Sequence, residues 1–228
     1  MRQSRPCCRR WWWCSQELRL LSAGLSRGQV LDAALDLVDR DGVAALSMRR
    51  LGAELGVEAM TVYHYLPNKD ALLDGIVERV MAQAETGLAD GPWDQAPTSY
   101  ARSLRATLLR HPGAVLLVAT RPAVTPETLR AAERGLTLLC DAGFPVGRAL
   151  DTLNALTLFV VAHAASEVST AAVNSAAAAG SQDYVASLDE RDFPLLTRAA
   201  RISAGTDDRT RFEFAVAAFI RGLAPTAS

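Results

Sequence analysis

The chain has 228 residues, of which 50% are hydrophobic and 21% are charged, and its formal net charge is −1. This length allows one or two domains with a sizeable core, and the composition excludes a disordered chain. Four cysteines are too few for a disulfide scaffold, which favours a reducing, cytoplasmic compartment. No membrane segment is expected, because no apolar run reaches ~20 residues without a charge or a strongly polar break.

The first 23 residues differ from the rest of the chain. Four arginines surround Cys7 and Cys8, and three consecutive tryptophans precede Cys14. The stretch lacks the apolar core of a secretory signal, and its cysteines lack the paired spacing of a zinc site. A basic arm that reaches a DNA minor groove is an alternative. The simplest interpretation of residues 1–23 is a disordered leader, or residues upstream of the natural start.

A first helix is predicted to begin at Ser26. Ser26 and Gln29 have the spacing of a capping box, in which each side chain accepts a hydrogen bond from the other residue's backbone N–H. Apolar residues then recur at three- and four-residue intervals as far as Asp41-Gly42. Glycine accepts the left-handed conformation that ends many helices, so the helix is expected to stop there.

Two short helices and a long one are predicted next. Ser47 can cap the first, which runs to Leu55, and Gly56 separates it from a second over about residues 58–65. Asn68 can cap the long helix that follows. Two short helices that cross around a small apolar plug are typical of a helix-turn-helix, whose second helix enters the major groove of DNA. The plug would be formed by Leu51, Leu55, Val57, Val62 and Leu66.

The rest of the chain keeps a helical pattern beyond a turn marked by residues 91–94 and Pro97. Apolar or amphipathic helices are expected at residues 115–119, 129–140, 150–168 and 209–223, and an Ala/Ser-rich stretch over 169–181 predicts a weak helix or a loop. No alternating run indicates a sheet. The predicted fold class is therefore all-α, with a helix-turn-helix domain over residues 24–70 joined by a long helix to a helical bundle over residues 71–228.

A series of motifs follows the same order along residues 26–75. These are Ala33-Ala34, Asp41-Gly42, Leu46-Ser47-Met48-Arg49, Leu51-Gly52, Leu55-Gly56-Val57, Thr61-Val62-Tyr63 and Leu66-Pro67-Asn68-Lys69-Asp70-Ala71-Leu72. In this order they resemble the tetracycline-repressor (TetR) family of bacterial regulators. The resemblance implies a transcriptional regulator in which the second short helix faces double-stranded DNA.

The resemblance also implies which side chains contact DNA. Lys69, the only lysine beside 23 arginines, stands where a long helix begins, so its charge and the free backbone N–H groups can bind one phosphate. Residues 47–70 carry no net charge, so non-specific affinity should be modest and salt-sensitive. The implied contacts are Arg49, with Ala59, Met60 and His64 at base edges and Thr61, Tyr63, Tyr65 and Lys69 at phosphates. Without the motif, the two tyrosines and His64 would be ordinary surface residues, and Arg49 would pair with Glu54 or Asp70.

Weaker motifs resemble the TetR-type C-terminal domain over about residues 98–168. They are His111-Pro112-Gly113-Ala114, Thr120-Arg121-Pro122, Leu139-Cys140-Asp141-Ala142-Gly143-Phe144 and Ala149-Leu150. Leu117 stands where the tetracycline-binding members place a metal-ligand histidine, and Ser166 aligns with their acidic ligand, so neither a metal nor a cofactor is expected. A pocket for a small apolar effector could instead be lined by Leu104, Leu108, His111, Leu117, Leu136, Leu139, Asn154, Leu158 and His163. The alternative is that the leucines form the core, that His163 is a hydrogen-bonded core or interface residue, and that His111 ends a helix.

The helices at residues 151–168 and 209–223 are more apolar than one domain face requires. Paired about a two-fold axis they would make a four-helix interface, so a homodimer is expected. Two recognition helices about 34–36 Å apart would read a palindromic operator. The predicted function is therefore a repressor that a small ligand releases from DNA.

The sequence also bears on two other classes of function. An enzyme is disfavoured, because His64, His111 and His163 lie far apart and the nucleophile-elbow, phosphate-loop and metalloprotease motifs are absent. A helical small-molecule- or partner-binding protein without productive DNA binding remains an alternative. Ala59 and Met60 leave room for it, since longer polar side chains read bases better.

Overall fold

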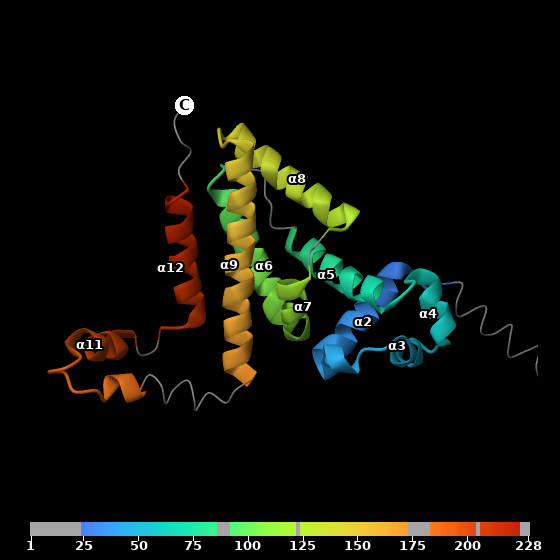
Figure 1. Cartoon of the computed structure of the whole chain (residues 1–228), viewed down its shortest axis with the longest axis horizontal. Coiled ribbons are helices and arrows are strands. Elements are labelled where there is room, and N and C mark those ends of the chain that lie inside the picture. Colours follow the sequence, from blue (N-terminus) through green and yellow to red (C-terminus); the bar gives the residue numbers. More distant parts are fainter. Residues whose placement is uncertain (1–23, 86–91, 122–123, 173–182, 204–205, 224–228) are drawn as a thin grey trace, which may run out of the picture.

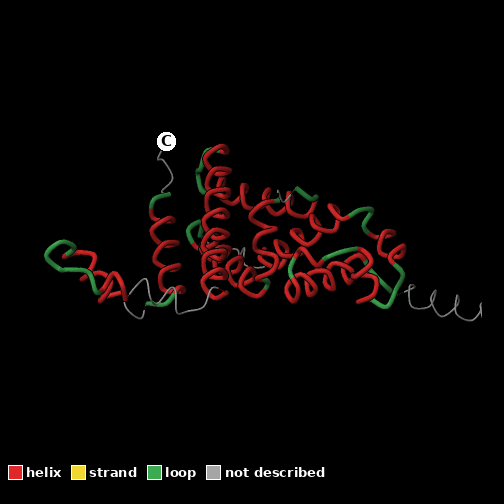
Figure 2. The backbone as a smooth tube through the Cα atoms, turned by 60° about the horizontal axis from the view of Figure 1, so that its bottom comes forward, coloured by secondary structure: helices red, strands yellow, loops and turns green. Residues whose placement is uncertain are grey.

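The computed structural model describes residues 24–85, 92–121, 124–172, 183–203 and 206–223. Within these ranges all regular structure is helical and no strand occurs, which confirms the predicted all-α class (Figures 1 and 2). The predicted leader, residues 1–23, lies outside the described residues, as does most of the Ala/Ser-rich stretch.

Helix α2 (Arg27–Asp41) begins and ends where the sequence predicts. The Ser26 side chain accepts from the Gln29 N–H and the Gln29 side chain accepts from the Ser26 N–H, so the capping box is complete. Gly42 ends the helix with a φ of 79°, a conformation that favours glycine. A short 3-10 turn, η1 (Val43–Ala45), follows and was not predicted.

Helices α3 (Met48–Glu54) and α4 (Ala59–Tyr65) form the predicted helix-turn-helix, and α5 (Lys69–Glu85) follows. Gly56 turns the chain with a φ of 67°. A Cβ added to Gly52 would lie 2.9 Å from the Val57 carbonyl oxygen, so glycine lets the two short helices approach closely. At the start of α5, the Asn68 Oδ1 accepts from the Ala71 N–H over 2.8 Å, as its predicted cap.

The body consists of α6 (Gln95–Arg110), η2 (Pro112–Ala114), α7 (Val115–Thr120), α8 (Pro126–Asp141), α9 (Val146–Ala172), α11 (Pro194–Ser203) and α12 (Asp208–Arg221). Pro97 was predicted to mark the turn before α6, but it lies within the first turn of that helix. The N–H groups of a first turn have no partner inside the helix, so proline is tolerated there.

One apolar core runs from the helix-turn-helix into the body. Helix α5 packs against α2 on one side and against α6 on the other, and its Ile76, Val77 and Val80 are buried in the same cluster as Leu37 and Leu104. A second, smaller cluster surrounds Leu139, Phe144 and Ala149 at the other end of the body. Because α5 belongs to both parts, it can carry a displacement from one to the other.

Helix α9 forms the long axis of the body (Figure 1). The sequence predicts burial on more than one side of this helix, yet Leu158 is 68% exposed in the single chain and Leu150 and Val146 are also exposed. The stretch Val146–Ser169 is long and apolar enough to cross a membrane, although a helix of a soluble protein's core passes the same test.

Candidate DNA interface and ligand cavity

The outer face of α4 presents most of the residues that the sequence assigns to DNA. Met60 is 72% exposed and Tyr63 is 42% exposed, and His64 is exposed beside them. Ala59 and Thr61 are half-buried. Val62, on the opposite side, is fully buried in the plug, so α4 packs on this side and presents Met60, Tyr63 and His64 outward.

The two cations assigned to DNA are available to bind it. Among the described residues, Arg49 and Lys69 form no ion pair, and both are exposed. The two carboxylates that could have neutralised Arg49 are engaged elsewhere. Glu54 accepts two hydrogen bonds of 3.0 Å from Arg40, which lower the pKa of this carboxyl, and Asp70 pairs with Arg121. The alternative in which Arg49 pairs with Glu54 or Asp70 is therefore wrong.

The two tyrosines of α4 differ in their surroundings. The Tyr65 hydroxyl donates a 2.7 Å hydrogen bond to the Leu25 carbonyl, and its ring meets that of His64 edge-on at 5.6 Å. This bond fixes the chain entering α2 against α4. The Tyr63 side chain instead faces outward, so Tyr63 is the better placed of the two to bind a phosphate.

One carboxylate of α2 binds two residues of the body. The Asp39 Oδ2 lies 2.7 Å from the His111 Nδ1, and its Oδ1 accepts a 3.1 Å hydrogen bond from the Gly113 N–H. The other ring nitrogen of His111 lies 3.2 Å from the Gln83 side-chain oxygen on α5. A Cβ on Gly113 would collide with the Val38 carbonyl oxygen, so only glycine lets η2 lie this close to α2.

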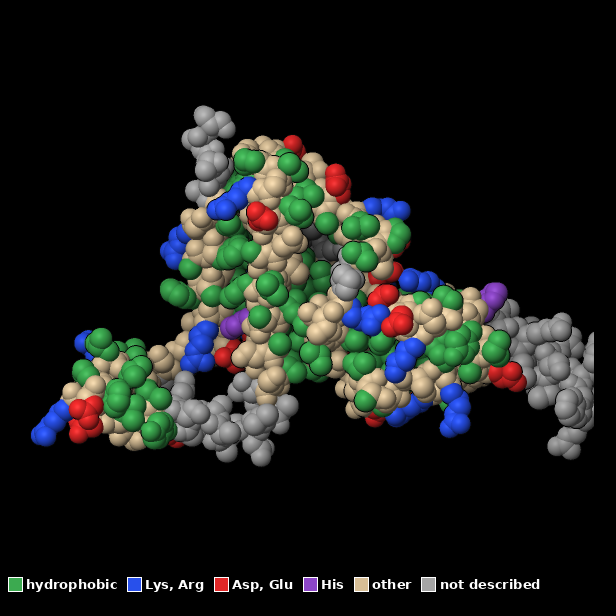
Figure 3. Space-filling view, viewed as in Figure 1, with side chains coloured by type: hydrophobic (Ala, Val, Ile, Leu, Met, Phe, Trp, Pro, Cys, Tyr) green, Lys and Arg blue, Asp and Glu red, His purple; other side chains and the backbone are tan. Residues whose placement is uncertain are grey.

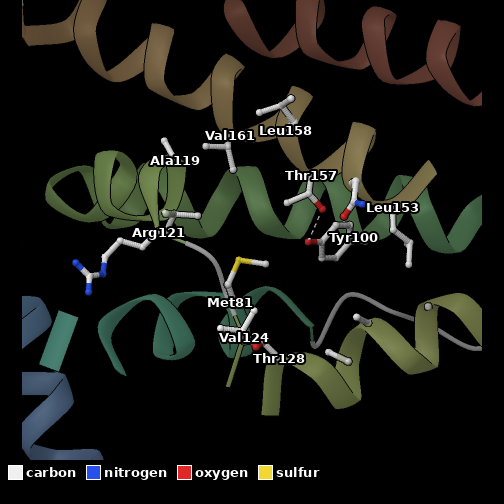
Figure 4. A pocket seen from close by; sticks show the side chains of 15 residues that line it. Met81, Tyr100, Ala119, Arg121, Val124, Thr128, Leu153, Thr157, Leu158 and Val161 are labelled. Carbon is white, nitrogen blue, oxygen red and sulfur yellow. Dashed lines mark hydrogen bonds between the residues drawn. The ribbon is translucent and has the colours of Figure 1, made fainter. Parts of the chain in front are cut away.

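A cavity of about 440 Å³ lies in the body between α5, α6, α7, α8 and α9 (Figure 4). Its lining is mostly apolar, with Met81 from α5, Val118 from α7 and Val161 from α9 among the contributors. This size and character are typical of small-molecule sites. The polar residues of the lining are Tyr100, Arg121, Thr128, Asn154 and Thr157.

The polar lining is partly organised already. The Tyr100 hydroxyl and the Thr157 Oγ1 lie 3.1 Å apart and share a hydrogen bond across the cavity wall (Figure 4). Arg121 stands at the end of α7, and its guanidinium turns toward α5, where Asp74 and Asp70 bind it. The hydrogen bond to Asp74 is the main cause that raises the pKa of this guanidinium.

The cavity corrects the predicted lining. Asn154 and Leu158 line it, whereas the other seven predicted residues lie elsewhere, for reasons of packing. Leu104, Leu108 and Leu117 are buried in the main core, and Leu139 and Leu136 belong to the second cluster. His111 joins the body to α2, as described above. His163 stacks on Phe159 and Phe212. Arg121, which lies in the Thr120-Arg121-Pro122 motif, is a lining residue that the sequence does not predict.

The residues of the cavity do not suit a hydrated magnesium ion. No carboxylate is among the lining residues in the described part of the chain, and this part holds no group of three His, Cys, Asp or Glu residues that could bind a metal ion. Glu167, next to the aligned Ser166, is already bound by Arg105 over 2.6 Å and faces His163 at 3.3 Å. Divalent cations need free oxygen ligands with charge, which this site does not offer.

Comparison with known families agrees with this architecture. The family model described as bacterial regulatory proteins, tetR family, matches residues 30–76, and the model of the tetracyclin repressor-like C-terminal domain matches residues 87–227. The chain belongs to the TetR family. The first match covers the helix-turn-helix, and the second covers the body with every lining residue of the cavity except Met81. Members of this family are transcriptional regulators, which makes the chain a ligand-responsive, DNA-binding regulator.

Individual TetR proteins show how far the likeness extends. The class E tetracycline repressor of Escherichia coli is 33% identical over 88% of this chain and 92% of its own. The repressor DrrR1 of Streptomyces coeruleorubidus is 34% identical over 63% of this chain, a match that spans 54% of that protein. The structure of ActR from Streptomyces coelicolor without ligand superposes with a TM-score of 0.77 at 30% identity, covering 87% of this chain and 94% of ActR. ActR has also been solved with actinorhodin bound.

Proposed function

We propose that the chain is a repressor that binds a palindromic operator as a homodimer and leaves it when a small ligand fills the cavity. The observation that carries this proposal is the exposed face of α4 together with two cations, Arg49 on α3 and Lys69 at the start of α5, that form no ion pair among the described residues. The proposed function involves no catalysis, and its place is the cytoplasm, where the operator lies.

The proposed DNA contacts divide into two groups. Ala59 and Met60 lie at the start of α4, and His64 lies near its end. These three residues would meet base edges in the major groove. Arg49, Thr61, Tyr63 and Lys69 would hold phosphates, with Lys69 aided by the free N–H groups at the start of α5. Tyr65 would act chiefly by positioning α4, because its hydroxyl is bound to Leu25.

Exposed apolar residues on the body support the homodimer. Phe214 on α12 is 72% exposed, and Leu158 on α9 is 68% exposed. Helix α11 lies apart from the bundle and also carries hydrophobic side chains on its surface, with Leu195 77% exposed and Ile202 70% exposed (Figures 1 and 3). Large exposed apolar surfaces mark sites of association, and a two-fold pairing of α9 and α12 would cover Phe214 and Leu158.

The cavity supports control by a ligand. ActR has been solved in complex with actinorhodin, and the cavity of about 440 Å³ with its mostly apolar wall has the size and character of a small-molecule site in this chain. The cavity touches α5, which starts at Lys69 and packs against α2. A ligand that moves α5 would alter the spacing of the two α4 helices in a dimer, and such coupling is typically worth about 1–3 kcal/mol.

A charge reversal at Lys69 tests the proposal. Binding of the wild type and of Lys69→Glu to DNA upstream of the chain's own gene is measured by gel shift at constant salt, with Arg130→Glu as a matched reversal on the body. The proposal expects binding by the wild type and Arg130→Glu, and its loss in Lys69→Glu with the dimer intact. Equal behaviour of all three would favour the binding-only alternative.

A further inference from the structure

Arg121 belongs to the cavity and to the start of α5 at the same time. It is one of the residues that line the cavity, but its guanidinium points away from the other labelled side chains of the lining (Figure 4). Its Nε donates to Asp74 over 2.8 Å and its Nη2 donates to Asp70 over 3.1 Å. Among the described residues that line the cavity, Arg121 is the only one with a charge.

We infer that the cavity takes an apolar ligand with a carboxylate, and that this carboxylate competes with Asp70 and Asp74 for Arg121. The inference rests on the proposed function and names its ligand class. A carboxylate inside an apolar wall loses its water and needs a cation to replace it. A guanidinium supplies two parallel hydrogen bonds to such a group, and only Arg121 can do so from this lining.

The competition would affect DNA binding through Asp70. This carboxylate follows Lys69 directly, its side chain is 80% exposed, and Arg121 is its ion-pair partner in the described structure. While the pair holds, the charge of Asp70 is offset beside the proposed phosphate site. Once Arg121 turns to a ligand, an unpaired negative charge stands next to Lys69 and repels the phosphate. Through this one guanidinium, ligand binding would weaken DNA binding.

A simpler alternative is that Arg121 only fastens the end of α7 to α5. That role predicts a loss of stability when Arg121 is replaced, but no preference for ligand charge. It also predicts no gain when the two aspartates are neutralised. The two roles therefore differ in whether ligand charge matters and in whether neutralising the two aspartates tightens ligand binding.

The decisive experiment uses anthracene carboxylate and its neutral carboxamide as probes, titrated calorimetrically into the full chain without DNA. We expect the wild type to prefer the carboxylate by roughly tenfold or more, and Arg121→Gln to lose this preference. Arg130→Gln, which removes an exposed arginine of α8 outside the lining, should retain it. The double variant Asp70→Asn/Asp74→Asn should bind the carboxylate severalfold more tightly than the wild type does. It should bind the carboxamide with the same affinity as the wild type.

A second arm measures affinity for selected operator DNA. Arg121→Gln should weaken it severalfold, and adding Asp70→Asn should restore it. Equal binding of the two probes by the wild type, or binding of neither, overturns the ligand class. If the double asparagine variant binds the carboxylate no more tightly than the wild type does, the competition is overturned. This variant is also the test to use if Arg121→Gln does not fold. If the wild type binds no DNA, the proposed function fails, while the calorimetry still decides the role of Arg121.

Discussion

Asp39 and His111 are 72 positions apart, yet the Asp39 Oδ2 and the His111 Nδ1 lie 2.7 Å apart. The same carboxylate accepts the Gly113 N–H, so a single side chain of α2 holds both the end of α6 and the start of η2. The helix-turn-helix is thus fixed to the body by a specific polar contact in addition to the shared core. We expect a movement of the body around its cavity to act on α2 at this point.

Replacing Asp39 by alanine should loosen this joint. The variant leaves the Gly113 N–H and a ring nitrogen of His111 without their acceptor, so the free energy of unfolding should fall by about 1–3 kcal/mol. Urea unfolding at fixed protein concentration measures it. Asp36→Ala is the control, because Asp36 is exposed on the same helix and has no hydrogen-bond partner in the described structure. Equal losses in the two variants would contradict the role of the joint.

Gly113 offers a steric test of the same contact. Gly113→Ala places a methyl group against the Val38 carbonyl oxygen and should force η2 away from α2, reducing the ligand-induced change in DNA affinity. Gly147→Ala meets open space within α9 and should leave that change intact. The quantity to compare is the ratio of operator dissociation constants with and without ligand. An unaltered ratio in Gly113→Ala would show that the contact transmits nothing.

The tyrosines of α4 should separate DNA contact from folding. Tyr63→Phe removes an outward-facing hydroxyl and should weaken operator binding with the melting temperature nearly unchanged. Tyr65→Phe removes the bond to Leu25 and should lower the free energy of unfolding by about 1 kcal/mol. Anisotropy titrations and thermal melts give the two readouts. The assignment is wrong if Tyr65→Phe costs more DNA affinity than Tyr63→Phe without losing stability.

An aspartate at Phe214 should break the homodimer. Phe214 is 72% exposed on α12, and Leu116 is 70% exposed on α7, so Leu116→Asp is a control of equal exposure on a different face. Sedimentation velocity should show monomers for Phe214→Asp and dimers for Leu116→Asp. Dimers in both cases would remove α12 from the interface.

The pair of Glu213 with Arg102 predicts a dependence of stability on pH. Its hydrogen bonds lower the pKa of the Glu213 carboxyl, so the ionised form favours the folded state. The stabilisation is complete above the ordinary glutamate pKa of about 4.3 and is lost as the pH falls through the lowered value. Because both side chains are partly exposed, it should stay below about 1 kcal/mol. Unfolding of wild type and Glu213→Gln should differ near neutral pH and converge in acid, and a constant difference would contradict this.

Local signals in the sequence sufficed for the helix-turn-helix. Ser26, Ser47, Asn68, Gly42 and Gly56 act within a few residues of their own positions, so each cap and turn could be predicted from spacing. The plug also follows from local periodicity, because a residue such as Val62 must be buried if α4 is to rest on α3.

The cavity could not be predicted in the same way. Its walls come from five helices, and periodicity identifies apolar residues without telling core from lining, which is why Leu104 and Leu139 were assigned to it. The joint between Asp39 and His111 and the pairing of Arg121 with Asp70 depend on how distant helices pack. No local pattern carries that information.

The most direct test of the account is selection of bound DNA from a random pool by the purified full chain, followed by footprinting at constant salt. The account predicts an enriched palindrome with two equivalent protected half-sites, centred about one helical turn or a multiple of it apart. Enrichment of no sequence, or of a site with a single protected half, would contradict it.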